Sequence, residues 1–460
     1  MLLSGCATFS PDGGMTPVAL LADTTLHKEV AVIRTPEDAK RTQEVVQRLR
    51  RHVLTADSAV QIALLNNRGL QAAYNELAIA EAAMIGDSLP PNPTFSISRI
   101  TGGGSVAIER QIVVDILALA TLPVRSDIAG KRFRQAQLRA MEATLRTAAE
   151  VRRAYYQSVA ARDLTTLLTR AESTAKTTAQ LATKLGETGA LNKLDQAREQ
   201  VFYAETTAEL AAVRQEATGA KERLIRLLGF WERDLDFRIP DALPALPPRP
   251  ASLPSIEVDA VSRRVDLQIA RIELEALAKS YGLTQATRFL NLLDVTGISK
   301  KTTAPDSGIL RERGLSAQVQ IPIFDFGEVR TRQAEATYMQ AVNRLTEKAI
   351  NVRSEAREAY RTYRASYDIA SHYQQEILPL RKIITEESQL RFSAMQIDVF
   401  ALLLEARQRI ASLRAAIEAK RAFWLAKTNL TTVVIGGGGG ADNPTAGSNA
   451  VASTPAAVGP

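Results

Sequence analysis

The sequence is poor in the residues that most often carry chemistry or cross-links. Its 460 residues include one cysteine and three histidines, which excludes an internal disulfide and leaves no Cys/His pair at zinc spacing. The histidines, His27, His52 and His372, are scattered, and the chain lacks both a G-x-S-x-G motif and a phosphate-binding glycine loop. We therefore expect no enzymatic activity, no cofactor and no metal.

Long apolar runs and a strong excess of one charge are also missing. No window approaches the ~18–20 unbroken apolar residues of a membrane-spanning helix. The 57 Lys and Arg residues are interspersed with 50 Asp and Glu residues, for a formal net charge of +7. This mixture is typical of a solvated helical surface, so nucleic acid is not expected as a partner. Hydrophobic residues make up 45% of the chain, which is enough for a folded core.

Two stretches that cannot form regular structure divide the chain. Prolines recur every few residues in 236–256, which excludes a helix there, and we interpret this stretch as a linker. The tail, 436–460, is rich in glycine, alanine and proline, cannot build a core and is expected to be disordered. The linker separates two halves of similar size, 54–235 and 257–435, and an N-terminal segment, 7–53, precedes them.

The two halves carry the same features in the same order and are interpreted as internal repeats. Each contains a helical segment, then strand-like segments, then long helical patterns. Short pairs match along both halves: Leu70-Gln71 with Leu267-Gln268, Ala154-Tyr155 with Ala359-Tyr360, and Ala197-Arg198 with Ala406-Arg407. Shared helical composition explains one such match, but three in a single order favour a duplication.

The helical patterns are very long. Apolar residues three or four apart form a narrow seam of the kind that packs helix against helix, as in Leu403, Ala406, Ile410, Leu413 and Ile417. No proline interrupts 124–186, which could reach about 90 Å as a helix. Helices of this length predict a rod or a tube. The tyrosines on these patterns are expected to pack in seams rather than contact a substrate: Tyr155, Tyr156, Tyr360, Tyr363 and Tyr367.

Short alternating segments lie between the helices of each half. We predict two hairpins, one from strands 94–100 and 108–116 and one from strands 289–298 and 315–323, with glycine-containing turns. Strands of about 9–11 residues can cross a bilayer, although an ordinary soluble sheet is the alternative. Backbone groups in lipid must all be paired, and single-chain barrels begin at about eight strands. Membrane-spanning hairpins would therefore require several copies of the chain in one barrel.

The single cysteine, Cys6, directly follows the letters LLSG. This stretch resembles the cleavage box of bacterial lipoprotein signal peptides, in which the cysteine becomes the lipidated first residue of the mature protein. A signal peptide also has a basic start and an apolar run of about 7–15 residues. We interpret 1–6 as the remnant of such a peptide, with a structural cysteine as the alternative.

A helix, a hairpin and long helices, repeated behind this box, resemble the TolC-like outer membrane factors of bacterial efflux and secretion systems. The resemblance covers 54–434 and depends on AVQIALLNNRGLQAAYNELAIAEA followed by LPPNP, on PIFDFGEVRTRQAEA, and on FSAMQIDVFALLLEAR. It implies a mainly α chain with a small β part and two repeats. In such a homotrimer, four strands per chain form a transmembrane β-barrel in the outer membrane, and the long helices form a coiled-coil barrel across the periplasm.

The resemblance also implies a function and partners. The chain would be a passive exit duct of a tripartite efflux system, opened at its periplasmic helix tips by an adaptor (membrane fusion) protein and working with an inner-membrane transporter. It would lie in the bacterial outer membrane, anchored to lipid through a palmitate-bearing Cys6, and extend into the periplasm. A duct for type I protein secretion and a coiled-coil scaffold without a pore are the alternatives.

The helix tips are predicted at LGETGALNK and FSAMQIDVF. Glycine suits a tight turn there, with an ordinary helix C-cap as the plain alternative. The resemblance implies that gating and adaptor docking occur at Gly186, Gly189, Met395, Gln396 and Asp398. Repeated by threefold symmetry, the carboxylate of Asp195 or Asp398 would form a cation-favouring ring. Solvated surface aspartates are the alternative.

Overall fold

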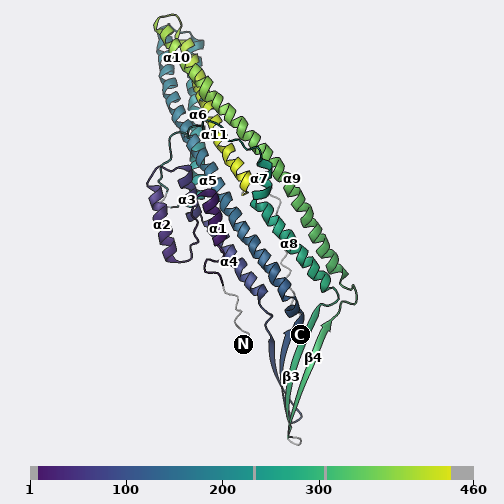
Figure 1. Cartoon of the computed structure of the whole chain (residues 1–460). Coiled ribbons are helices and arrows are strands. Elements are labelled where there is room, and N and C mark those ends of the chain that lie inside the picture. Colours follow the sequence, from purple (N-terminus) through teal and green to yellow (C-terminus); the bar gives the residue numbers. More distant parts are fainter. Residues whose placement is uncertain (1–8, 232–234, 305–307, 437–460) are drawn as a thin grey trace.

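The computed structural model of the chain describes residues 9–231, 235–304 and 308–436. Long helices run side by side in an elongated body, and a small sheet projects from one end (Figure 1). Cys6 and residues 437–460 of the predicted tail lie outside the described residues. In the described part of the chain, no helix has an apolar stretch long enough to cross a membrane.

The helices and strands follow the same order in both halves. The first repeat contains α4 (Arg68–Ser88), β1 (Thr94–Gly102), β2 (Ser105–Asp115), α5 (Ile116–Glu187) and α6 (Lys193–Leu228). The second contains α8 (Val265–Ala286), β3 (Leu292–Ala304), β4 (Gly308–Gln320), α9 (Glu328–His372), the π-turn η3 (Tyr373–Ile377), α10 (Leu378–Ser393) and α11 (Val399–Ile435). Shorter helices lie before α4 and α8: α1 (Thr16–Leu21), η1 (Ala22–Leu26), α2 (Pro36–Arg50) and α3 (Ala56–Asn66) before α4, and α7 (Ile256–Arg263) before α8. The predicted fold class, mainly α with a small β part, is confirmed.

The helix α5 runs from the sheet to the opposite end of the body. Its 72 residues correspond to about 110 Å of helix. The helix begins earlier than the predicted stretch 124–186 and contains Pro123, which removes one backbone hydrogen bond near this end. Asp115 caps the start, because its carboxylate accepts a hydrogen bond from the backbone N–H of Ala118 at 2.8 Å.

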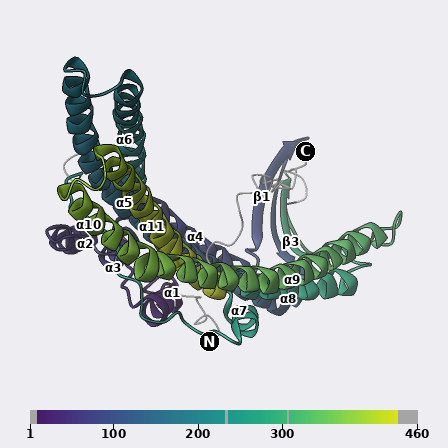
Figure 2. The same cartoon turned by 90° about the horizontal axis from the view of Figure 1, so that it is seen from above.

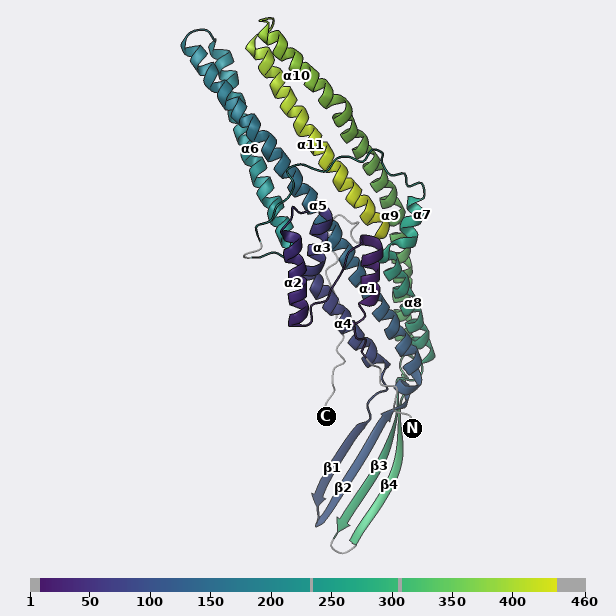
Figure 3. The ribbon, with the colours of Figure 1, turned by 60° about the vertical axis from the view of Figure 1, so that its left-hand side comes forward.

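The largest buried core lies at mid-height, where α1, α2 and α3 pack on the long helices (Figure 3). Buried hydroxyls in this core find partners. The hydroxyls of Tyr74 and Thr144 lie 3.0 Å apart, and that of Tyr155 donates to the carbonyl of Leu54 at 3.0 Å. Four of the five seam tyrosines are buried and the fifth, Tyr360, packs against a core, so the predicted seam packing is confirmed.

The proline-rich stretch 236–256 crosses the second repeat as an irregular segment. Tyrosines on α9 hold it in place. The hydroxyl of Tyr363 accepts a hydrogen bond from the backbone N–H of Ala251 at 2.9 Å, and that of Tyr367 donates to the carbonyl of Pro248 at 3.0 Å. Prolines donate no hydrogen bond, so the linker is fixed mainly through its carbonyls.

The four strands form one antiparallel sheet in the order β1-β2-β3-β4. Both predicted hairpins are present, and the pairing of β2 with β3 joins the two repeats. The predicted bounds of the second hairpin were wrong, because β3 and β4 each have 13 residues, β3 begins at Leu292 and β4 ends at Gln320. Pro322 cannot donate to the ladder, which explains why β4 ends before it.

The last helix of each repeat abuts the first helix of the same repeat. Gly229 follows α6 with a φ of 70°, and the side-chain amide of Asn66 donates to its carbonyl at 2.9 Å. Gly436 follows α11 with a φ of 100°, and a Cβ there would lie 3.0 Å from the backbone nitrogen of Val265. Both junctions need glycine, since φ is positive and another backbone is close. In each repeat, one helical path between the sheet and the far end of the body is continuous, and the other consists of two helices placed end to end.

Candidate functional site

The predicted tip residues lie in two separate turns at the end of the body farthest from the sheet (Figures 1 and 3). Two helical hairpins end there, α5–α6 and α10–α11. The first turn contains Gly186 and Gly189, and the second contains Met395, Gln396 and Asp398.

The α5–α6 turn closes the C-terminus of α5 with two kinds of backbone hydrogen bond. Gly189 has a φ of 71° and donates to the carbonyl of Gly186 at 3.1 Å, while Ala190 donates to that of Leu185 at 2.9 Å. This is the C-cap that glycine favours. Gly186 serves the packing of the hairpin, because a Cβ there would lie 2.7 Å from the side-chain oxygen of Gln196 on α6.

The α10–α11 turn has the same hydrogen bonds without a glycine. Met395 has a φ of 58° and donates to the carbonyl of Phe392 at 2.9 Å, while Gln396 donates to that of Arg391 at 2.8 Å. Left-handed backbone is unfavourable for a residue with a Cβ. The two repeats therefore share one turn geometry, and Met395 occupies the place of Gly189 at a cost in strain.

The two candidate ring carboxylates have different surroundings. Asp195 accepts a hydrogen bond from the side-chain amide of Asn192 at 2.7 Å and forms an ion pair with Arg198 at 2.9 Å. Asp398 is exposed and caps α11, because it accepts the backbone N–H of Ala401 at 2.8 Å. Within the described residues, Asp398 has no cationic partner. Of the two, only Asp398 offers an unpaired charge.

Exposed apolar side chains surround the tips. Met395 is 94% exposed, and four others lie nearby in sequence on the same hairpins: Leu181, Leu194, Leu390 and Phe392. A group of large apolar side chains at the end of a polar rod is typical of a surface that meets a partner. The sequence analysis did not assign Leu194 or Leu390 to the tips, although they lie one and two residues from a predicted turn.

A row of ion pairs joins the two hairpins along α6 and α11. Its arginines are seven residues apart on α11, and the pairs are Arg407 with Glu199 at 2.7 Å, Arg421 with Glu216 at 3.2 Å, and Arg414 with Glu209. The sequence analysis missed this row. The seven-residue spacing of the arginines could have indicated it, because residues seven positions apart lie on the same face of a helix.

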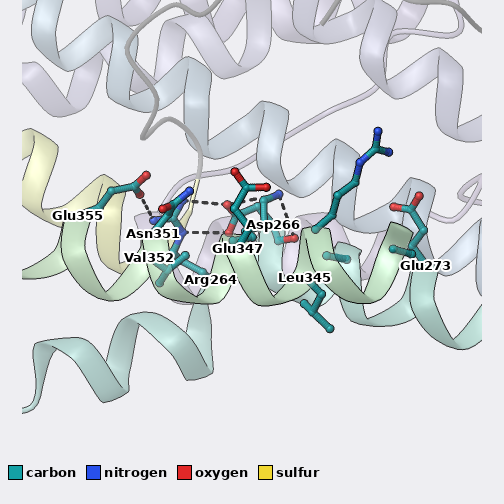
Figure 4. A pocket seen from close by; sticks show the side chains of 12 residues that line it. Arg264, Asp266, Glu273, Leu345, Glu347, Asn351, Val352 and Glu355 are labelled. Atoms are coloured by element: carbon teal, nitrogen blue, oxygen red, sulfur yellow. Dashed lines mark hydrogen bonds and ion pairs between the residues drawn. The ribbon is translucent and has the colours of Figure 1, made fainter. Parts of the chain in front are cut away.

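Nearer the middle of the body, a cavity of 490 Å³ lies between α8 and α9 (Figure 4). Arg264, 4% exposed, points into it and donates two hydrogen bonds to Asp266, at 2.9 and 2.8 Å, and a third to Glu355. Lys348 lies 3.7 Å from the Asp266 carboxylate. Burial alone would raise the pKa of Asp266, but the hydrogen bonds and charge of Arg264 outweigh it and hold that pKa below its usual range.

Glu142 on α5 lies near the same charged cluster. Burial raises the pKa of Glu142, and the negative charge of Asp266 raises it further. We find no catalytic arrangement in this cluster, since its charges are satisfied mainly by one another. Among the residues that the structure describes, no group of three or more His, Cys, Asp or Glu side chains could hold a metal ion.

The sheet has two chemically different faces. Cross-strand pairs place large apolar residues on the first, which we term the apolar face: Phe95, Ile97, Ile112, Val114, Val295, Leu315 and Val319. The opposite face, which we term the polar face, carries Ser96, Ser98, Glu109, Gln111, Asp294, Glu312, Gln318 and Gln320, and interspersed among them Ile100, Val113, Leu292, Ile298 and Leu310. This alternation is typical of strands with lipid on one side and water on the other.

The described residues thus combine a small open sheet that has one apolar face with helices far longer than a bilayer is thick. Residues 258–389 match the sequence pattern of the family described as Outer membrane efflux protein. This match runs from α7 into α10. No curated protein sequence matches the chain.

Solved outer membrane channels share the fold over most of their length. The CmeC outer membrane channel of Campylobacter jejuni is 16% identical, with 89% of this chain and 89% of that chain covered and a TM-score of 0.70. The MtrE outer membrane channel of Neisseria gonorrhoeae is 17% identical, with 85% and 89% covered and a TM-score of 0.66. CusC is 17% identical, with 83% and 92% covered and a TM-score of 0.67. The predicted resemblance is confirmed by the family match and by the fold.

Proposed function

We propose that three copies of this chain form the outer-membrane exit duct of a tripartite efflux system. The observation that carries the proposal is the open edge of the sheet. In the described sheet β1 and β4 each have one neighbouring strand, so each has a row of unpaired backbone groups. Such groups must be paired in lipid. Pairing β4 of one copy with β1 of the next satisfies both edges, and three copies supply twelve strands, above the lower limit of about eight.

The dimensions of the chain support a barrel in the membrane with a tunnel beyond it. A strand of 13 residues tilted by about 40° covers about 34 Å along the membrane normal, which is enough for a hydrocarbon core of about 30 Å. The long helices all extend from the same end of the sheet (Figure 1). They extend into the periplasm, and the strand turns face the cell exterior.

The polar face of the sheet lines the lumen. It carries all the strand carboxylates, among them Glu109, Asp294 and Glu312, and its side chains can hold water in a passive conduit. A coiled-coil scaffold without a pore would not require a sheet with an apolar face. The presence of this face therefore favours the duct over the scaffold.

The tips act as the gate and as the docking site for a periplasmic adaptor protein, which in turn meets an inner-membrane transporter. Exposed Met395 and its apolar neighbours supply the docking surface, with Gln396 and the turn glycines Gly186 and Gly189 shaping the tips. Asp398 is our candidate for an acidic ring in the lumen, since its charge is unpaired in the described chain.

An anchor at Cys6 is supported by the position of the described N-terminus. Ser10 donates its backbone N–H and its hydroxyl to buried Glu81 at 2.7 and 2.5 Å. Glu81 lies seven residues before the end of α4 at Ser88, or about 10 Å of helix, and the four residue steps from Cys6 to Ser10 can span up to about 14 Å. A lipid on Cys6 can therefore reach the bilayer beside the sheet and bring the chain to the bacterial outer membrane.

The test is detergent extraction of outer membranes followed by native mass measurement. We expect a complex of three chains in the outer-membrane fraction. A monomer in the soluble fraction would contradict the duct. Cys6→Ser is the matched variant, because it should remove the mass of the lipid and leave the trimer intact.

A further inference from the structure

Charged side chains on the strands are sorted by sign between the two faces of the sheet. The register places five cations on the apolar face, which we term the cation belt: Arg99, Arg110, Lys301, Arg311 and Arg313. Every strand carboxylate lies on the polar face, as does Lys300, which lies 4.0 Å from Glu312. In the described sheet, the apolar face thus carries five positive charges and no negative one.

The cation belt occupies two adjacent rows across the sheet. Arg99, Lys301 and Arg311 share one row, and Arg110 and Arg313 share the next, about 7 Å away along the strands. All five are exposed, and none forms an ion pair with a described residue. Lys301 and Arg311 are direct cross-strand partners, and two like charges placed opposite each other destabilise a sheet. Folding of the chain therefore does not explain the belt.

The belt lies near the outer end of the apolar face, and one further row, which includes Val106 and Ile309, separates it from the strand turns. Between the belt and the helices, that face is formed by side chains such as Ile112, Leu315 and Val319, and it continues into exposed Ile321 after β4. Arg313 and Ile321 are separated by about 27 Å along the strand, or about 20 Å across the membrane at a tilt of about 40°. This approaches the height of about 25 Å typical of the apolar band of a barrel.

We propose that the cation belt binds the phosphate groups of lipids in the leaflet farthest from the helices. The inference rests on the proposed membrane barrel. Guanidinium groups bind phosphate oxygens in pairs, and the apolar row beside Arg110 and Arg313 accepts the acyl chains of the same molecule. A free phosphate has no acyl chain that could contact that apolar row. The ligand is therefore a phosphate-bearing lipid, and a trimer carries three copies of the belt.

The test uses the full-length trimer in phosphatidylcholine nanodiscs that contain a minority of diphosphorylated lipid A. Native mass spectrometry then counts the lipid A molecules that the protein retains. The belt variant is Arg99→Gln with Arg311→Gln and Arg313→Gln. Its matched control replaces three exposed helical cations: Arg170→Gln, Lys176→Gln and Arg361→Gln. At about fivefold per charge near a membrane surface, the three substitutions of the belt variant should together weaken lipid A retention roughly a hundredfold, and the control should match the wild type.

Each result has a separate meaning. Equal retention by an intact belt-variant trimer would overturn the lipid site and leave the duct standing, whereas a wild-type chain that forms no trimer would overturn both. Displacement of lipid A by inorganic phosphate at equal concentration would show a site for a soluble anion and overturn the proposal. If the triple variant does not assemble, Arg313→Gln alone should weaken retention several-fold, and Arg313→Lys should restore only part of it, because an ammonium group keeps the charge but not the paired hydrogen bonds.

Discussion

Removal of Arg264 should strongly destabilise the second repeat, because it leaves carboxylates without their partner in a nearly dry site. Arg264 is 4% and Asp266 8% exposed, and their two hydrogen bonds are 2.9 and 2.8 Å long. In Arg264→Met, Asp266 keeps only the backbone N–H of Leu267 at 2.9 Å and Lys348 at 3.7 Å. Breaking a buried ion pair by removing one partner typically costs about 3–5 kcal/mol. The lower end applies here, since Lys348 remains and Glu355 is partly exposed.

Chemical unfolding of the detergent-solubilised protein, followed by the helical circular dichroism signal, measures this loss as a shift of the transition midpoint. The neighbouring Arg263 is exposed, so Arg263→Met should change the free energy of unfolding by less than about 0.5 kcal/mol. Arg264→Met with Asp266→Leu should recover much of the loss, because the charges then left without these partners, Glu355 and Lys348, are partly exposed. The reasoning fails if Arg264→Met unfolds at the same midpoint as Arg263→Met.

Three further changes have expected outcomes. Glu142→Gln should stabilise the protein at neutral pH, because the raised pKa of Glu142 means that the ionised carboxylate is disfavoured in the folded state. In thermal unfolding, this gain in stability should shrink as the pH falls through that pKa. A gain that does not depend on pH would contradict the prediction. Gly189→Ala should destabilise the α5–α6 turn by about 1 kcal/mol, and Met395→Gly should stabilise the α10–α11 turn by a similar amount. Hydrogen exchange of the turn amides measures both changes. Exchange rates equal to those of the wild type in both variants would refute the strain argument. Asp398→Asn should lower the cation selectivity of trimers in planar bilayers, whereas Asp195→Asn should not, because Arg198 already pairs with Asp195 at 2.9 Å; equal effects would argue against the ring.

Features with a local periodic signal could be predicted from the sequence. The helical seams, the duplicated order of elements and both tips follow from residue spacing and turn chemistry, and the structure has them where the patterns indicate. The long helix was predicted too short because Pro123 reads as a boundary, although it lies close enough to the start of α5 to be tolerated.

Features that depend on partners far away in the chain could not be predicted. The outer half of β4 reads LRERG, which breaks the alternation of apolar and polar residues, so the strand was placed too late. Only the cross-strand register shows that Arg311 and Arg313 share a face with Ile309 and Leu315. The arginine spacing on α11 is visible in the sequence, but its glutamate partners on α6 belong to the other repeat and needed the three-dimensional arrangement.

The glycine junctions at mid-height have a mechanical consequence. The helices α6 and α11 reach the tips but end at Gly229 and Gly436, so neither is a single rigid lever running down to the sheet. Each can pivot at its joint while α4 and α8 stay in place below. In the proposed duct, α6 and α11 can therefore swing at the tips without pulling directly on the sheet, and only α5 and the continuous α9–η3–α10 path transmit the movement to it.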